Sequence, residues 1–566
     1  MRAPRGLLFL MLILLLYLSL SPVAGTSAQV SDSQTGLRLI GAVTDRLKQP
    51  VLEAQVLLKK GESVVAEGLT QADGSYTLVL PDAARGDFTL LVKRQHFMDA
   101  TLSITAEDIA GLSPDEALVI PTIEMERQVT LAFWVATLVF AGMLLMIALE
   151  KLHNVLAALT GVSLVLGVSY LGEPLVRDLY IFDFLRALQY IDWNVIFLIM
   201  GMMIVIAVVE GTGLFHWLAF FAYRISRGKA SLLMGILMVI TALASAFLDN
   251  VTTMLLMTPI TVQIALALGL NPLTLLIPEV MASNVGGIIT LVGTPTNILI
   301  GSFANISFAG FLTNLTPGVL ISLVGLFAYC LIVYRKDLAT SSAGISPALL
   351  EKLEENAQIM EPGNLRRVGW VGLGMLVLFL VGERFHLLPA VTAMLGATAL
   401  LVWIRPNVEE MIEAVDWTTL VFFMALFIVV GAIQEVGLVS MLAQWIAGVI
   451  GGNLPLAMIT VIWAGALIST VIANIPFTAA MLPVIGYLTT TIPGAESLVL
   501  FFCLSVGSAM GGNGSLIGAS ANMVTAGIAE RVGYPISYAY FLRKGMPALF
   551  LTVALATGWL LVRFVV

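Results

Sequence analysis

The chain has 566 residues, of which 59% are hydrophobic and only 11% are charged, and its mean hydropathy is +0.97. This balance excludes an ordinary soluble domain and indicates a polytopic membrane protein. The net charge of −8, without a long basic run, argues against a nucleic-acid partner. The 2 cysteines lie in apolar segments and the 4 histidines are scattered, so we expect neither a disulfide framework nor a metal cluster.

Residues 1–28 have the pattern of a secretory signal peptide. Arg2 and Arg5 precede an apolar core from Leu7 to Leu20, and small residues follow. We expect cleavage after Ala28. An uncleaved signal anchor is the alternative, because the length of the apolar core suits both.

Residues 29–127 alternate apolar and polar side chains in short runs such as "LRLIGAVTD" and "DFTLLVK", separated by turn residues such as Asp73-Gly74. A period of two residues predicts strands, here in a small antiparallel β-sandwich. The order of these runs resembles the carboxypeptidase-regulatory-like, transthyretin-type domain. The resemblance implies an accessory module without catalytic residues, which the signal peptide would place outside the cytoplasm.

Apolar segments long enough to span a membrane recur from residue 128 onward, in two series separated by a cytoplasmic linker at 336–365. In the first series, residues 128–335, we expect spans near 130–149, 154–172, 193–210, 273–304 and 311–334. In the second series, residues 366–566, we expect spans near 366–383, 388–404, 417–435, 496–530 and 547–565. Between the third and fourth span of each series lies an apolar stretch with a polar centre, 230–268 and 454–491. Each of these two stretches predicts a re-entrant hairpin. A pair of true spans is the alternative, because two helices of about 18 residues each lie at the low end of the length needed to cross.

The two series are copies of one unit. "DWNVIFLIMG" from Asp192 parallels "DWTTLVFFMA" from Asp416, an offset of 416 − 192 = 224. The same offset pairs Asn250 with Asn474 and Pro259 with Pro483, and one residue later in register Asn297 pairs with Asn522. Five crossings in each copy make the second enter from the opposite face, as an inverted repeat. The excess of Lys and Arg in the connections expected in the cytoplasm agrees with this topology.

Polar residues interrupt the apolar segments at equivalent places in both copies. The hairpin tips read "FLDNVTT" and "ANIPFT", and the fourth spans contain "SNVGGIITLVGTPTN" and "GSAMGGNGSLIGASAN". We expect the glycines to permit unwinding there, and Pro295 and Pro476 to lie in the first turn of a restarting helix. Paired interruptions of this kind mark a midplane binding site, because helix N-termini attract anions and freed carbonyls can ligate Na⁺.

The candidate substrate- or ion-binding residues lie at these four interruptions. They are Asp249, Asn250, Thr252, Thr253, Ser283, Asn284, Gly286, Gly287, Thr294, Pro295, Thr296, Asn297, Asn474, Pro476, Thr478, Ser508, Asn513, Ser515, Ser520 and Asn522. The competing interpretation is that small residues only allow close helix packing. Asp249 and Glu279 are carboxylates at membrane depth and therefore candidate coupling groups. Asp249 would also suit a helix N-cap, and Glu279 could lie near the cytoplasmic interface.

"FLDNVTTMLLMTPIT" followed by "SNVGGIITLVGTPTNILIG" resembles the ion transporter superfamily over residues 130–566, close to the P protein, arsenite permeases and NhaD-type antiporters, with citrate and dicarboxylate carriers more distant. The resemblance implies an all-α membrane domain of two inverted five-helix repeats, each with a re-entrant hairpin and a broken helix. It also implies a homodimer and an elevator movement of 193–304 and 417–530. Thr294 stands where P-protein-like members carry an acid, and the tips lack the Ser-Asn-Thr of dicarboxylate carriers.

These features predict a multi-pass transporter of the plasma (inner) membrane, not an enzyme. We expect it to move a small inorganic or organic anion across the lipid bilayer, coupled to H⁺ or Na⁺ and without another cofactor. A sodium/proton antiporter and an extracytoplasmic sensor are the alternatives. No loop of the form G-x-x-x-x-G-K-[ST] appears, which argues against a self-contained ATP-driven pump and leaves a separate ATPase subunit open as a partner.

Overall fold

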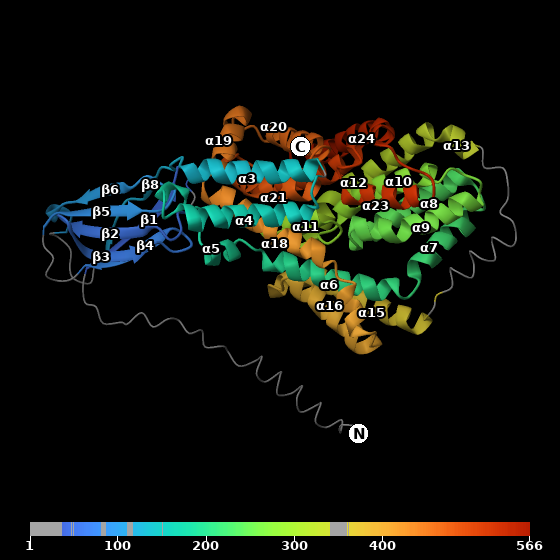
Figure 1. The fold of residues 1–566 in the computed structure, drawn as a ribbon, viewed down its shortest axis with the longest axis horizontal. Helices are drawn as coiled ribbons and strands as arrows, with labels where there is room; N and C mark the ends of the chain where they lie inside the picture. Colours follow the sequence, from blue (N-terminus) through green and yellow to red (C-terminus); the bar gives the residue numbers. More distant parts are fainter. Residues whose placement is uncertain are drawn as a thin grey trace, which may run out of the picture. The chain divides into compact units, whose positions relative to one another are not determined.

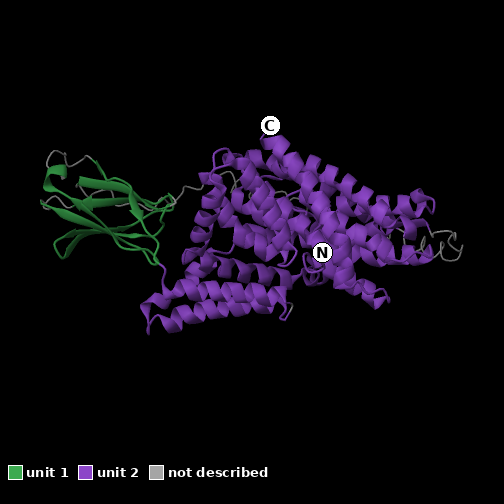
Figure 2. Cartoon of the chain, turned by 90° about the horizontal axis from the view of Figure 1, so that it is seen from above, with its two compact units in different colours: residues 1–128 green, residues 129–566 purple. Residues whose placement is uncertain are grey.

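The computed structural model describes residues 37–46, 48, 50–80, 86–109, 117–149, 151–339, 359 and 361–565. The predicted signal peptide and most of the predicted linker lie outside these residues. The chain divides into two compact units, Met1–Gln128 and Val129–Val566 (Figure 2).

Unit 1 is a sandwich of two small sheets around its own apolar core (Figure 1). One sheet contains β4 (Ser75–Leu80), β1 (Leu37–Asp45), β7 (Ala117–Val119) and β8 (Ile123–Met125), and the other has the order β3 (Ser63–Leu69), β2 (Gln55–Lys60), β5 (Phe88–Lys93), β6 (Ala100–Ile104), followed by α2 (Ala106–Ile109). Strand β1 alternates buried and more exposed residues, so that Leu39 and Val43 face the core with Tyr76. The two-residue period therefore forms the sandwich by burying one face of each sheet.

The expectation of a purely antiparallel sandwich is wrong for one sheet. Strand β1 pairs antiparallel with β4, but it pairs in parallel with β7 and with β8. Between β4 and β7 the chain passes through β5, β6 and α2, so that β7 lies beside β1 and runs in the same direction. A hairpin would have forced the opposite direction.

Two carboxylates of unit 1 make its stability depend on pH. Asp73 accepts hydrogen bonds from the amide and hydroxyl of Ser75, and Asp108 accepts the same pair from Thr105. These bonds lower the pKa of both carboxyls below the ordinary value. The stabilisation is present above about pH 4, the unfolded value, and is lost as pH falls through the lower folded value. The melting temperature of residues 29–128, measured by circular dichroism, should therefore fall at acid pH, and it should fall less in D73N/D108N. An equal fall in both proteins would contradict this.

Unit 2 is helical. Among its described residues, 9 helices are long and apolar enough to cross a membrane. The first half contains α3 (Leu131–Ala148), α4 (Asn154–Gly172), η1 (Arg177–Leu179), α5 (Phe184–Gln189), α6 (Trp193–Glu210), α7 (Leu214–Ser226), α8 (Ala230–Phe247), α9 (Asn250–Ala267), α10 (Leu273–Gly286), η2 (Gly287–Ile289), α11 (Pro295–Ala304), α12 (Phe308–Val333) and α13 (Arg335–Ala339). The second contains α15 (Pro362–Val381), η3 (Gly382–Phe385), α16 (Pro389–Ile404), α17 (Val408–Glu413), α18 (Trp417–Glu435), α19 (Leu438–Ile450), α20 (Leu454–Ser469), α21 (Asn474–Thr491), η4 (Ala495–Ser497), α22 (Val499–Gly511), η5 (Gly512–Gly514), α23 (Ser520–Arg531) and α24 (Tyr538–Phe564). The predicted polytopic helical architecture is confirmed.

The halves repeat the same element order, from the hairpins α8–α9 and α20–α21 to the broken pairs α10–α11 and α22–α23. The short amphipathic helices α7 and α19 each begin directly after a glycine with positive φ, Gly213 at 78° and Gly437 at 93°. That left-handed conformation is available to glycine without strain, and it turns the chain at the end of the preceding long helix. The equivalent glycines make the same turn in each half.

Helices α12 and α24 lie against each other and run in opposite directions. Ser322 Oγ donates to the carbonyl of Thr552 (3.1 Å), and these positions are equivalent under the offset 547 − 317 = 230 that pairs Pro317 with Pro547. Tyr329 donates to the carbonyl of Lys544, and Trp559 donates to that of Asn314, and these two bonds exchange under the same offset. The two equivalent helices therefore contact each other reciprocally and cross near Ser322 and Thr552.

Other contacts between the halves obey the same exchange. Helix α4 packs on α18 and α16 packs on α6, and likewise α9 packs on α23 and α21 on α11 (Figure 1). Each hairpin thus lies beside the restarting helix of the opposite half. This arrangement brings the four polar interruptions toward one central region.

Candidate functional site

Both fourth spans are interrupted where the sequence predicts it. Helix α10 ends at Gly286 and continues for one 3₁₀ turn, residues 290–294 are not helical, and α11 starts at Pro295. Residues 515–519 form the equivalent gap before α23. Thr294 caps α11 by accepting a hydrogen bond from the amide of Thr296 (3.1 Å). Pro295 occupies the first helical position, where no amide hydrogen is needed.

The glycines at these interruptions serve a different purpose from the one expected. None of Gly286, Gly287 or Gly293 has positive φ, so their backbone conformations are open to other residues. They are required by space: a Cβ on Gly286 would lie 2.5 Å from the Ala242 carbonyl oxygen, and one on Gly293 would lie 2.6 Å from the Ser245 oxygen. Close approach of α8 to the broken span, rather than unwinding, explains them.

Replacing Gly286 with alanine should separate α8 from α10. We expect the free energy of unfolding to fall by about 1–3 kcal/mol, as for other overpacked cores. Gly527 provides the matched control, because it lies within α23 with no atom near its Cβ direction. Gly527→Ala should be neutral or stabilising by about 0.5–1 kcal/mol. Thermal unfolding in detergent measures both, and equal melting temperatures for the two variants would contradict the close packing.

Two equivalent asparagines bridge the interruptions by hydrogen bonds to backbone carbonyls. Asn297 Nδ2 donates to the carbonyls of Ile288 (3.1 Å) and Thr290 (2.8 Å). In the second half, Asn522 Nδ2 donates to the carbonyls of Gly512 (2.7 Å) and Ser515 (2.8 Å). Two of the carbonyls exposed at each interruption are thereby satisfied without water.

A fully buried amide network joins the two halves. Asn284 accepts a hydrogen bond from Asn250 (2.9 Å) and donates to Asn513 Oδ1 (3.0 Å) and Asn522 Oδ1 (3.1 Å). Asn297 accepts one from Ser505 (2.5 Å), across the same boundary. The network therefore connects the first hairpin tip with both broken spans, using uncharged groups alone.

The hairpin tips differ in how their helices are capped. Asp249 caps α9: its carboxylate accepts the amides of Val251 and Thr252 and the Thr252 hydroxyl. The equivalent N-cap of α21 is Ala473, which has no capping side chain. Near it Thr478 is fully buried, and its hydroxyl has no hydrogen-bond partner among the described residues. The amide of Ile475 in the second tip thus lacks the side-chain cap that its counterpart Val251 has, whereas Pro476, the counterpart of Thr252, has no amide hydrogen.

The remaining predicted residues lie around this centre without joining the network. Thr253 bonds to the carbonyl of Asp249, Thr294 to Thr296, Ser283 to Ser245, Ser508 to the Ser505 carbonyl and Ser515 to the Thr470 carbonyl; Asn474 and Pro476 are buried in the first turn of α21. Ser520 is exposed at the start of α23, so the structure does not bring it into the buried centre. Sequence reasoning missed Ser505 and Thr290, which are single polar residues in apolar surroundings.

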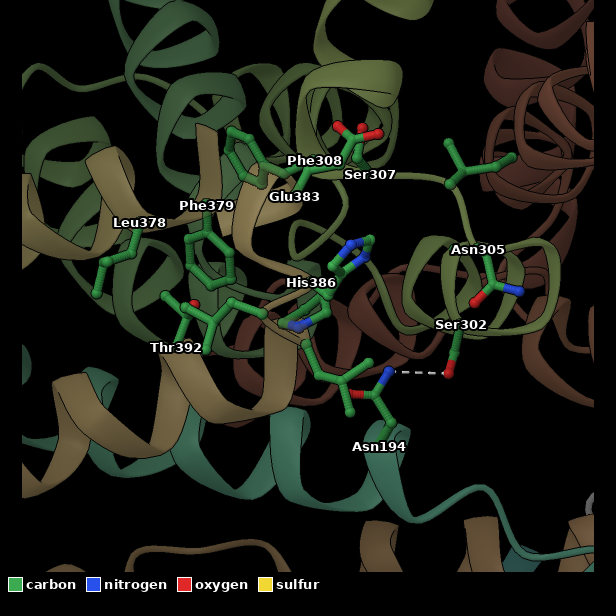
Figure 3. A pocket seen from close by; sticks show the side chains of 15 residues that line it. Asn194, Ser302, Asn305, Ser307, Phe308, Leu378, Phe379, Glu383, His386 and Thr392 are labelled. Atoms are coloured by element: carbon green, nitrogen blue, oxygen red, sulfur yellow. Dashed lines mark hydrogen bonds between the residues drawn. The ribbon is translucent and has the colours of Figure 1, made fainter. Parts of the chain in front are cut away.

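A separate cavity of about 320 Å³ lies beside α6, α11, α12 and α16, and none of the predicted site residues lines it (Figure 3). The stacked rings of Phe308 and Phe379 form one wall, with centroids 5.2 Å apart. Asn194 Nδ2 donates to Ser302 Oγ (2.9 Å), and Asn194 Oδ1 accepts the amide of Ala390 (3.2 Å). Asn194 therefore links α6 to α11 and to the start of α16.

The apolar helices and the buried polar centre define a polytopic membrane protein, and comparison with known proteins identifies its class as a membrane transporter. Residues 144–507 match the citrate transporter family CitMHS, and the chain belongs to this family. It is 36% identical over 434 residues to an uncharacterized transporter of Mycobacterium bovis, covering 76% of this chain and 99% of the relative. The family and these relatives are transporters and not enzymes.

The chain is also similar to the P protein of Homo sapiens, with 32% identity over 520 residues, which cover 78% of this chain and 61% of the P protein. Among solved structures, the YdaH transporter of Alcanivorax borkumensis aligns with a TM-score of 0.47 and 14% identity. That alignment covers 64% of this chain and 84% of the other. It is too distant to support a functional comparison.

Proposed function

We propose that this transporter is a secondary active carrier that moves a small anion or oxyanion across the plasma (inner) membrane, coupled to H⁺ or Na⁺. The observation that carries the proposal is the unused hydrogen-bond donors beside the buried amide network. Helices α21 and α23 begin without a side-chain cap, and Thr478, in the second turn of α21, has a hydroxyl without a hydrogen-bond partner among the described residues.

These donors suit an anion. Asn522 is the third residue of α23 and bonds to Asn284, while α21 packs against α11 and α22, whose Asn297 and Ser505 bond to each other. Uncapped helix N-termini present free amide hydrogens and the positive end of the helix dipole. A bound anion would replace the amide–amide bonds of the network with bonds to itself.

The absence of basic side chains limits the charge of the substrate. In helices α8–α11 and α20–α23, Arg531 in the last turn of α23 is the only Lys or Arg. Helix dipoles and neutral amides stabilise about one negative charge more readily than three. A small ion is therefore preferred, and citrate, the substrate in the family name, belongs in the test as a competitor.

The crossed helices support alternating access by inverted repeats. Antiparallel α12 and α24 are what an inverted repeat requires, since equivalent helices then cross the membrane in opposite directions. We assign residues 193–304 and 417–530 to the moving part, and the other membrane helices to a fixed, homodimeric scaffold. The cavity in Figure 3 lies along this boundary, where Asn194 and Ser302 of the moving part meet Ala390 of the scaffold.

Asn284→Asp tests the anion site. A carboxylate at the centre of the network repels a bound anion, and loss of the amide donors leaves two buried acceptors unpaired, worth about 1–3 kcal/mol. Uptake into proteoliposomes driven by an H⁺ or Na⁺ gradient should fall about tenfold or more. The panel consists of chloride, phosphate, arsenite, citrate and succinate.

Asn407→Asp is the matched control, because Asn407 caps the short helix α17 and aspartate caps equally well. It should transport as the unmodified protein does. The proposal is refuted if neither an H⁺ nor a Na⁺ gradient drives uptake of any anion in the panel by the unmodified protein. Full uptake by N284D would also refute it.

A sodium/proton antiporter is the second candidate function, and Asp249 is the residue that favours it. As a cap, Asp249 is replaceable by asparagine, which satisfies the same amides with a change of only a few tenths of a kcal/mol. As a cation ligand it is not, because the charge is lost. If D249N keeps anion uptake, the capping role is supported; if it abolishes Na⁺-driven pH change in folded protein, the antiporter assignment replaces ours.

A further inference from the structure

The proposed function leaves the coupling ion open, and a polar cluster in the first half bears on it. Glu279 on α10 is fully buried. Its Oε1 accepts hydrogen bonds from Thr261 on α9 (3.0 Å) and Thr241 on α8 (3.3 Å). Its Oε2 is buried and has no hydrogen-bond partner among the described residues.

The fold does not need this cluster, and the second half of the molecule shows it. Under the repeat offsets, Thr241, Thr261 and Glu279 correspond to Gly465, Ile485 and Leu504. The same three-helix packing is therefore built there from apolar residues and glycine. A buried carboxyl without a counter-charge is costly, so its presence in one copy alone points to a function.

No Lys or Arg among the described residues forms an ion pair with this carboxyl. The elements that pack on α10 include α8, α9, α12, α22 and α23. Their ionisable groups are Asp249 at the N-cap of α9, Tyr329, Cys330, Cys503, Glu530 and Arg531. None of these forms an ion pair or hydrogen bond with Glu279 in the described structure. The free oxygen Oε2 is thus where a proton would reside.

A second polar contact leads from the cluster to the amide network. One helical turn along, Ser283 Oγ donates to Ser245 Oγ (3.1 Å), and Asn284 follows directly. Asn284 lies five positions after Glu279 on α10, a rise of about 7.5 Å along the helix and a rotation of about 140° around it. A carboxylate at Glu279 would therefore repel an anion held by Asn284 across the body of one helix, where little water screens the charges.

We infer that Glu279 is the coupling site, that the coupling ion is H⁺, and that its proton must bind before the anion does. The inference rests on the proposed function. Glu279 takes a proton from water on Oε2, and the neutral carboxyl then allows the anion to bind beside Asn284. Thr241, Thr261 and Glu279 all lie within 193–304, so the proton moves together with the anion and is returned to water on the other side.

Glu279→Gln tests the inference, because glutamine imitates the neutral carboxyl. In the unmodified protein, anion affinity should fall roughly tenfold or more as pH rises through the titration of Glu279. In E279Q it should stay high and independent of pH. E279Q should also exchange labelled anion between the two sides of a vesicle, yet lose accumulation driven by a pH gradient. E279L introduces the leucine found at the equivalent position 504, so it provides a second neutral variant if E279Q does not fold. Glu530→Gln, at an exposed position, is the matched control.

Three results would overturn the inference: accumulation driven by a pH gradient in E279Q, loss of exchange in folded E279Q and E279L, or drive by a Na⁺ gradient that E279Q abolishes. Infrared spectroscopy separates this failure from that of the proposed function. In difference spectra against E279Q, the carbonyl band of a protonated carboxylic acid should titrate in the unmodified protein and in E530Q, even if no tested anion is carried. Difference spectra without that band would also overturn the inference.

Discussion

A helix that stops inside a membrane must satisfy its own backbone, since lipid offers no hydrogen-bond partner. In this protein Asn297 and Asn522 meet that requirement by donating to the carbonyls on the far side of each interruption. At the opposite end of each interruption a helix begins: α11, which Thr294 caps, and α23, which has no side-chain cap. Helix α21, at the second hairpin tip, also begins without a side-chain cap.

Duplication supplies the geometry of the site, and departures from duplication supply its chemistry. The exchange of contacts around Ser322 and Thr552 places each hairpin against the broken span of the other half. The two copies differ at key positions: Asn284 in the first copy corresponds to Ala509 in the second, and Glu279 corresponds to Leu504. The first half carries the carboxyl and the central amide, and the second half carries the uncapped helices and Thr478.

Much of this arrangement follows from the sequence, because a repeat of the same order, with paired Asn and Pro in apolar runs, has few explanations other than paired helix breaks. The sequence also included Asn250, Asn284, Asn513 and Asn522 among the candidate binding residues, since each lies at an interruption. It could not predict the role of the glycines, which depends on how closely α8 approaches α10.

Other features needed the fold itself. The parallel strand β7 pairs with β1 only after the chain has crossed to the other sheet, which no local pattern records. Thr241 and Thr261 read as ordinary residues of apolar helices until packing brings both to Glu279. Comparison of the two copies position by position would have found them, because their counterparts are Gly465 and Ile485.

The central claim is that two oppositely oriented copies jointly hold a small anion at Asn284 and the uncapped N-termini of α21 and α23. An electron cryomicroscopy map of the protein with a transported anion tests it most directly. We predict density within hydrogen-bond distance of Asn284 and Thr478, with the amide–amide bonds of the network rearranged around it. Density confined to the cavity beside Asn194, with the network unchanged, would contradict the account.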